Sequence, residues 1–108
     1  MSDSSLKIIN LAETVEPPAD GIISRTIYND ESVKAVAFGF GVGQELSEHT
    51  ASTSAIMHFL RGEADVTLGA EKSQAREGTW IHMPPSLPHS ILAKTPVVML
   101  LVLLKKST

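Results

Sequence analysis

The chain contains no cysteine. That absence excludes a disulfide framework, a thiolate nucleophile and a cysteine-based zinc or iron–sulfur site. Basic residues are also few: nine lysines and arginines stand against twelve acidic residues, which gives a net charge of -3. Only Lys105 and Lys106 are adjacent, so no positive stripe is available to neutralise a phosphate backbone. We therefore expect no nucleic-acid partner.

Long apolar runs are absent as well. The longest, Val97 to Leu104, has eight residues, whereas a membrane-spanning helix needs about 20. The first residues, Met1 to Ser5, lack the basic segment followed by an apolar stretch that marks a secretory signal. From these features we expect a cytoplasmic protein with no membrane partner.

The composition is that of a folded protein. With 108 residues, a hydrophobic fraction of 43% and a charged fraction of 19%, the chain is long enough for one packed core and too short for two ordinary domains. We divide it into an N-terminal arm over residues 1–21 and a single domain over residues 22–108. Within the arm, Leu6 to Leu11 could form a short edge strand, and Pro17 and Pro18 oppose regular structure in the segment that follows.

Short apolar and β-branched runs alternate with turn residues from Ile22 onward, and no stretch keeps a helical period over three turns. This pattern predicts an all-β sandwich or barrel. The predicted strands are Ile22 to Tyr28, Val33 to Phe40, Ser54 to Leu60, Ala64 to Leu68, Thr79 to Met83, Ser90 to Ala93 and Val97 to Leu104.

The last of these runs is apolar on both strand faces. A strand of this kind is covered by the core on one side and by another layer or subunit on the other. We therefore predict a homodimer.

Two sequence motifs resemble those of the cupin family. In the first, Gly43, His49 and Gly62 match, while Ala51 stands at the second histidine and Ala55 at the glutamate. In the second motif Gly78, Pro84 and His89 match, while Ser86 replaces a glycine and Ala93 an asparagine. The resemblance implies a cupin-type double-stranded β-helix, a jelly-roll barrel of two antiparallel sheets, with His49 and His89 pointing inside.

The resemblance also implies a divalent metal such as Mn, Fe, Ni or Zn, held by three histidines and one glutamate. This chain keeps His49 and His89 of the four, so we expect such a metal to be weakly held or absent. His82 is the best candidate for a third ligand. Glu45 could supply a carboxylate if no bulge intervenes before His49, and we place His58 on the outer face of its strand.

The neighbouring positions define a candidate ligand pocket. Ala51 and Ala55 stand where the motif has metal-ligating residues. Their small side chains would face into the barrel and enlarge the pocket. Met57, Phe59 and Trp80 would line the same pocket or fill the core, and core filling is the safer interpretation for each.

The sequence thus predicts a small cupin barrel that binds a small polar or anionic organic molecule near His49 and His89, with or without a weakly held metal. Two alternatives remain open. One is a metal-dependent enzyme of the dioxygenase or isomerase type. The other is a ligand-binding or sensing module without turnover.

Overall fold

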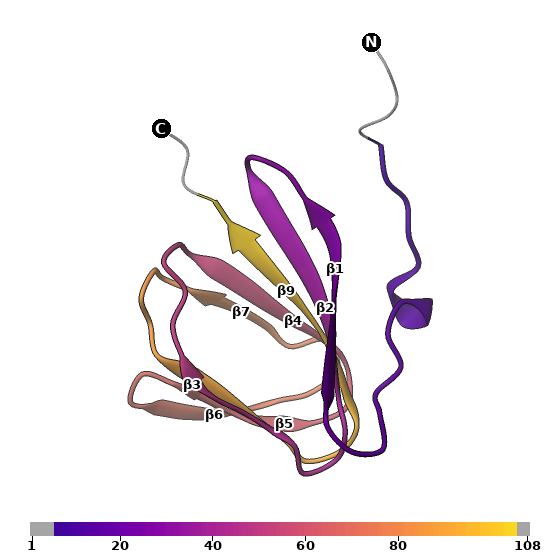
Figure 1. The fold of residues 1–108 in the computed structure, drawn as a ribbon. Helices are drawn as coiled ribbons and strands as arrows, with labels where there is room; N and C mark the ends of the chain where they lie inside the picture. Colours follow the sequence, from indigo (N-terminus) through magenta and orange to yellow (C-terminus); the bar gives the residue numbers. More distant parts are fainter. Residues whose placement is uncertain (1–5, 106–108) are drawn as a thin grey trace.

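Nine β-strands and one short 3-10 helix make up residues 6–105, the part of the chain that this computed structural model describes (Figure 1). The helix is η2 (Leu11–Glu13), and the strands are β1 (Ile22–Asn29), β2 (Val33–Phe40), β3 (Glu45–His49), β4 (Ala55–Arg61), β5 (Ala64–Leu68), β6 (Glu71–Ala75), β7 (Trp80–Met83), β8 (His89–Ala93) and β9 (Val97–Leu104). Residues 1–5 of the predicted arm and residues 106–108 of the predicted domain lie outside the described residues. Between 6 and 105, no helix has the length and apolar character to cross a membrane.

The strands form two antiparallel sheets that face each other (Figure 1). One has the order β1-β2-β9-β4-β7 and the other the order β3-β8-β5-β6. This arrangement confirms the predicted all-β fold with two antiparallel sheets. All seven predicted strands are present, and the apolar pattern missed only β3 and β6. These two are the edge strands of the smaller sheet, and they are mostly polar because they bury few side chains.

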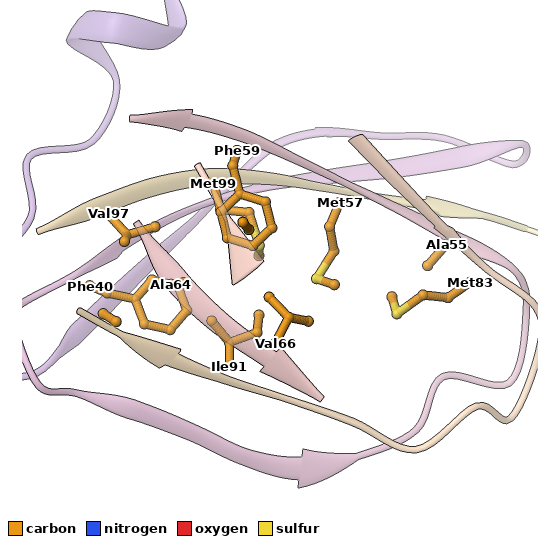
Figure 2. Packing of buried hydrophobic residues seen from close by; sticks show 12 residues of the cluster. Phe40, Ala55, Met57, Phe59, Ala64, Val66, Met83, Ile91, Val97 and Met99 are labelled. Carbon is orange, nitrogen blue, oxygen red and sulfur yellow. The ribbon is translucent and has the colours of Figure 1, made fainter. Parts of the chain in front are cut away.

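The core lies between the sheets and follows the two-residue period of the strands. In β4, Ala55, Met57 and Phe59 are buried, while the residues between them are partly exposed. Phe59 and Phe40 are fully buried, and Met99 and Ile91 pack with them in one cluster (Figure 2). Each such side chain contributes roughly 1.5–3 kcal/mol of hydrophobic stabilisation. The barrel is therefore filled along most of its length.

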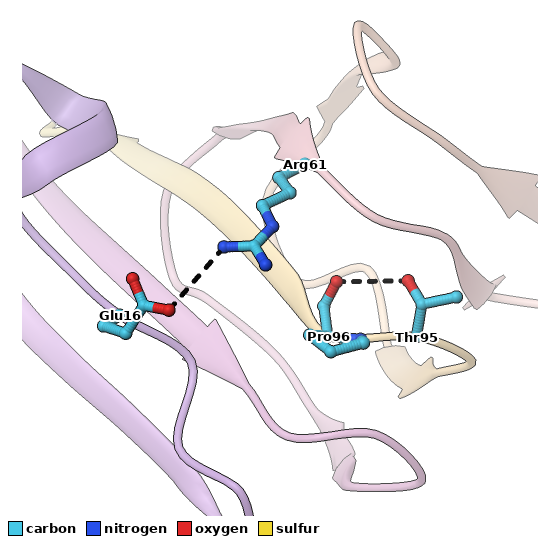
Figure 3. A network of polar contacts seen from close by, with 4 residues as sticks. All are labelled: Glu16, Arg61, Thr95 and Pro96. Atoms are coloured by element: carbon cyan, nitrogen blue, oxygen red, sulfur yellow. Dashed lines mark hydrogen bonds and ion pairs between the residues drawn. The ribbon is translucent and has the colours of Figure 1, made fainter.

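The N-terminal arm contains no strand among its described residues, so the proposed edge strand at Leu6 to Leu11 is wrong. The arm instead lies over the outer face of the larger sheet, where Val15 packs with Ile27 and Ala37. A segment lying over the face of a sheet has no free strand edge to pair with, so no ladder forms. Glu16 approaches Arg61 at 3.9 Å, but both side chains are mostly exposed, so this ion pair adds little stability (Figure 3).

Gly62 and Gly78 both adopt positive φ, +88° and +92°, but only one of them is confined. A Cβ at Gly62 would lie 2.0 Å from the carbonyl oxygen of Pro96 and 2.8 Å from Thr95 Oγ1, the two residues drawn beside Arg61 in Figure 3. A Cβ at Gly78 would meet nothing within 4 Å.

We predict that Gly62→Ala lowers the free energy of unfolding by more than about 3 kcal/mol, because the positive φ and the clash with backbone both contribute. Gly78→Ala is the matched control and should lose only about 1–2 kcal/mol, the cost of the left-handed conformation alone. Urea denaturation of both variants measures the difference. Equal losses would contradict the packing described for Gly62.

A polar cluster closes the β1–β2 turn. The Asp30 carboxylate accepts hydrogen bonds from the Tyr28 hydroxyl at 2.6 Å and from the backbone N–H groups of Ser32 and Val33. The Tyr28 hydrogen bond, followed by the backbone hydrogen bonds, lowers the pKa of Asp30. The same hydroxyl–carboxylate bond raises the pKa of Tyr28, because the phenol donates only while it is protonated.

Tyr28 is the single tyrosine of the chain, so its ionisation can be followed by ultraviolet absorbance. We predict that it ionises above its ordinary pKa of 10.0 and that Asp30→Asn brings the pKa back towards that value. The sign follows from the raised pKa: the stabilisation is complete below pH 10 and is lost as the pH rises through the folded-state pKa. Glu31→Gln, a neighbouring exposed acid, is the control. An unchanged titration in Asp30→Asn would show that the bond does not form.

Candidate functional site

Two imidazoles meet at one end of the barrel. His49 is the last residue of β3 and His89 the first residue of β8, and the two are cross-strand partners. Their ring centroids are 4.4 Å apart, with the rings nearly edge to face. His89 is 4% exposed, whereas His49 is exposed at the rim. The pair therefore lies at the boundary between the buried interior and the solvent.

An irregularity in β3 brings His49 to the inner side. Glu45 pairs with Leu92 and Leu46 with Ile91, but the register shifts before His49 pairs with His89. Because Ile91 and His89 are both buried, Leu46 and His49 both lie on the inner side, although they are three positions apart and would point to opposite faces of a regular strand. Glu45 is exposed and shares the outer face with Leu92. The prediction that Glu45 supplies a carboxylate is therefore wrong, because the bulge reverses the parity on which it depended.

Backbone carbonyls fix the tautomers of both rings. Nδ1 of His49 lies 2.8 Å from the carbonyl oxygen of Ser47, and Nδ1 of His89 lies 3.0 Å from that of Leu87. A carbonyl oxygen only accepts, so each Nδ1 donates its proton. In the neutral rings Nε2 is then the nitrogen with a free lone pair. Both side chains are thus oriented, and each keeps one acceptor for a ligand.

A cavity of about 310 Å³ adjoins the two rings. The β3–β4 and β7–β8 connections lie side by side at this end, on the left of Figure 1, where Ser86 N–H donates to the carbonyl oxygen of Ala51 at 2.7 Å. Ser86 has a φ of +67°, which is strained for a residue other than glycine. The cavity is lined by His49, Thr50, Ala51, Ser52, Thr53, Ala55, Met83, His89, Leu101 and Leu103. It has hydroxyl groups at its rim, an apolar wall, and no Lys, Arg, Asp or Glu in its lining.

Of the positions predicted for the pocket, Ala51 and Ala55 line this cavity. Met57 and Phe59 lie in the core instead, 1% and 0% exposed, and do not line it. Figure 2 shows Ala55 at the same end of the core as Met83, its cross-strand partner.

His82 and Trp80 face away from the cavity. In the β4–β7 ladder His82 pairs with Ile56 and Trp80 with His58, and these positions alternate with the buried ones. Both side chains are therefore exposed on the outer face of the larger sheet, and Trp80 is 59% exposed. The assignments of His82 as a third ligand and of Trp80 as a lining or core residue are wrong. His58 lies on the outer face, as expected.

The prediction missed the apolar wall of the cavity. Leu101 and Leu103 lie on the inner face of β9 with Met99, which is buried. Their two-residue spacing was visible in the sequence, but β9 is apolar at every position, so periodicity alone did not distinguish the inner from the outer face. Met83 immediately precedes the Pro84-Pro85 turn, and the turn concealed its orientation.

The donor set does not fit the metal site that the motif resemblance implies. Within residues 6–105, no three or more His, Asp or Glu side chains gather where they could hold a metal ion. His49 and His89 stand together, Ala51 and Ala55 lack ligand atoms, and Glu45 faces outward. Two neutral imidazoles without an anionic ligand bind divalent metals weakly.

A second hollow, of about 470 Å³, lies away from the histidines around Asp65, Gln74, Arg76 and Lys94. Its charges have both signs, and Lys94 lies 3.9 Å from Asp65 with both side chains about half exposed. It contains no imidazole. Of these two hollows, only the one beside His49 and His89 has imidazoles in its lining.

The fold and its sequence are similar to those of small bacterial barrels. A conserved protein of unknown function from Streptococcus pyogenes is 30% identical, with 94% of this chain and 90% of that chain covered and a TM-score of 0.85. An RmlC-like cupin from Desulfovibrio desulfuricans is 27% identical, covers 92% and 96%, and has a TM-score of 0.82. A cupin 2 conserved barrel domain protein from Leptotrichia buccalis is 26% identical, covers 90% and 47%, and has a TM-score of 0.83. No protein-family model and no curated protein matches the chain.

The contacts between the two Nδ1 atoms and the backbone carbonyls can be tested by the tautomer of each ring. We predict that at alkaline pH both His49 and His89 are protonated on Nδ1, and that two-bond ¹H–¹⁵N spectra of the ring nitrogens show this tautomer for each. His58 and His82, which donate no such bond in the described residues, serve as internal controls. A neutral His89 protonated on Nε2 would remove the free acceptor from the cavity and contradict the arrangement.

Proposed function

The chain belongs to the cupin superfamily of small barrel proteins, and on that premise we propose that it binds a small organic acid between His49 and His89. The observation that carries the proposal is the pair of oriented imidazoles at a cavity without fixed charge. The proposal concerns binding and assigns no reaction to the site.

An acid group is complementary to the hydrogen-bonding atoms of the two rings. With Nδ1 of His49 and His89 donating to backbone, the free Nε2 atoms of the neutral rings are both acceptors, so a ligand has to bring a proton. A small acid, which is ionised in neutral solution, meets this need by binding as its carboxylate together with one proton taken up from solvent. The carboxylate then accepts a charge-assisted bond from the imidazolium that forms. A ligand with a fixed positive charge would find no carboxylate in the lining, and a polyanion would find no lysine or arginine.

The other lining residues restrict the size and polarity of the part of the ligand beyond its acid group. Met83, Leu101 and Leu103 offer hydrocarbon and thioether surface, and the small side chains of Ala51 and Ala55 leave space beside the rings. A volume of about 310 Å³ is at the lower end for small-molecule sites. These features favour an acid with a short alkyl or single-ring body over a sugar or a nucleotide.

A weakly held divalent metal is compatible with the same two histidines. His49 and His89 would hold it through Nε2, and it would supply a Lewis acid to a ligand oxygen. We assign it no part in the binding proposed, because the two-imidazole set lacks both the third histidine and the carboxylate.

We predict that butyrate and benzoate bind wild-type protein at millimolar or lower concentration, with amide shifts in ¹H–¹⁵N spectra confined to residues 49–55 and 83–89. Because charge-assisted hydrogen bonds contribute roughly 1.5–3 kcal/mol, His89→Ala should weaken binding by about tenfold or more. Titration calorimetry in buffers of different ionisation heat should show uptake of about one proton per acid bound.

The controls separate the histidine pair from unspecific effects. His82→Ala removes an exposed imidazole on the outer face and should leave binding unchanged. Benzamide, which has the shape of benzoate without the acid, should bind more weakly. If protein purified without a histidine tag instead retains near-stoichiometric metal, lost in both His49→Ala and His89→Ala, the metal-dependent alternative replaces this proposal.

A further inference from the structure

The second hollow, of about 470 Å³, lies at the end of the smaller sheet away from the histidine pair. β5 begins there at Ala64, which pairs with Ala75 at the end of β6 and with Ala93 at the end of β8. His89 is at the other end of β8, roughly 13 Å from Ala93 along the strand. The hollow is therefore separate from the cavity beside the histidines.

Polar and charged side chains form most of the lining of this hollow, and their charges balance. They are two carboxylates, two cations, one amide and one hydroxyl, from Glu63, Asp65, Arg76, Lys94, Gln74 and Thr79. With a formal sum of zero, the lining favours neither a simple anion nor a simple cation. It is complementary to a ligand that carries one charge of each sign.

Backbone hydrogen bonds fix the two sides of the hollow. On one side the Glu63 carbonyl oxygen accepts from Lys94 N–H at 2.8 Å and from Thr95 N–H at 3.3 Å, and Glu63 N–H donates to Thr95 Oγ1 at 2.9 Å. On the other side Arg76 N–H donates to Thr79 Oγ1 at 3.0 Å, and Thr79 N–H donates to the Arg76 carbonyl oxygen at 2.9 Å. The charged side chains thus extend from backbone that a ligand does not have to order.

One cation and one carboxylate of the lining are not used in ion pairs. Lys94 Nζ lies 3.9 Å from Asp65 Oδ2, and both side chains are about half exposed, so this pair is weak. Glu63 and Arg76 form no ion pair with any residue between 6 and 105. They adjoin the cross-strand pair of Ala64 and Ala75, so they stand at the same end of the β5–β6 ladder.

We propose that this hollow binds a small zwitterion, of which a free amino acid is the simplest, with its carboxylate on the Arg76 guanidinium and its ammonium on the Glu63 carboxylate. A guanidinium binds a carboxylate through two parallel N–H···O bonds, and a carboxylate accepts from an ammonium. The ligand bridges two neighbouring groups of opposite charge. Each contact is exposed and weak by itself, so the expected affinity is millimolar and falls as salt is added.

We expect L-alanine to bind the wild-type chain with millimolar affinity and to shift amide signals at residues 63–65, 74–79 and 94 in ¹H–¹⁵N spectra. N-acetylalanine lacks the ammonium and alanine methyl ester lacks the carboxylate, so each should bind this hollow about fivefold more weakly or less. Signals of residues 49–55 and 83–89 report separately on any acid bound beside the histidines. L-Alanine should leave them in place, because that cavity has no carboxylate in its lining.

Arg76→Gln and Glu63→Gln should each weaken the binding of L-alanine by about fivefold or more, because each removes one charge and keeps the backbone hydrogen bonds of its residue. Arg61→Gln and Glu71→Gln are the matched controls, since both residues are exposed and neither lines the hollow. Amide spectra verify the folding of all four variants. No shift at the hollow in the wild-type chain, equal binding of the two single-charge derivatives, or unchanged affinity in Arg76→Gln would overturn the proposal.

Discussion

The candidate site depends on one extra residue in β3. In a regular strand Leu46 and Glu48 would share the inner face and His49 would point outward. The register shift between Leu46 and His49 returns the chain to the inner side one residue late, so that His49 meets the buried His89. The same shift leaves Glu48 exposed, and Glu45, which precedes it, lies on the outer face opposite Leu92, so no carboxylate reaches the cavity. One bulge therefore determines both which ligand atoms are present and the electrostatic character of the site.

Backbone carbonyls complete this arrangement. Each ring donates to a carbonyl oxygen two residues earlier in the chain, which leaves the two Nε2 atoms equivalent in chemistry although the rings differ in exposure. The contact between Ser86 N–H and the Ala51 carbonyl then joins the two connections beside the cavity. Ser86 adopts positive φ at a position where glycine would be unstrained, so the backbone there is held by this contact at some cost in energy.

The sequence predicted the fold well, because turn glycines, prolines and short β-branched runs specify strands locally. The meeting of His49 and His89 was implied by the resemblance of the two motifs to those of cupins. The orientations of Glu45, His82 and Trp80 did not follow, for two physical reasons. A single inserted residue reverses the parity of a strand, and a Pro-Pro turn breaks the parity relation between strands on either side of it. The orientation of His82 depends on its pairing with Ile56 in the β4–β7 ladder. A local sequence pattern does not contain such long-range pairing.

The same alternation places two surfaces back to back on β9. Leu101 and Leu103 form part of the cavity wall, while Val102 and Leu104 lie on the outer face of the larger sheet. The inner positions are apolar because they wall the cavity and join the core, and Leu100 on the outer face packs with the cluster beneath the N-terminal arm. Because β9 is hydrogen-bonded to β2 on one side and to β4 on the other, it cannot shift towards one surface without changing its packing at the other. The cavity wall and the outer face of the larger sheet are therefore constrained by one backbone.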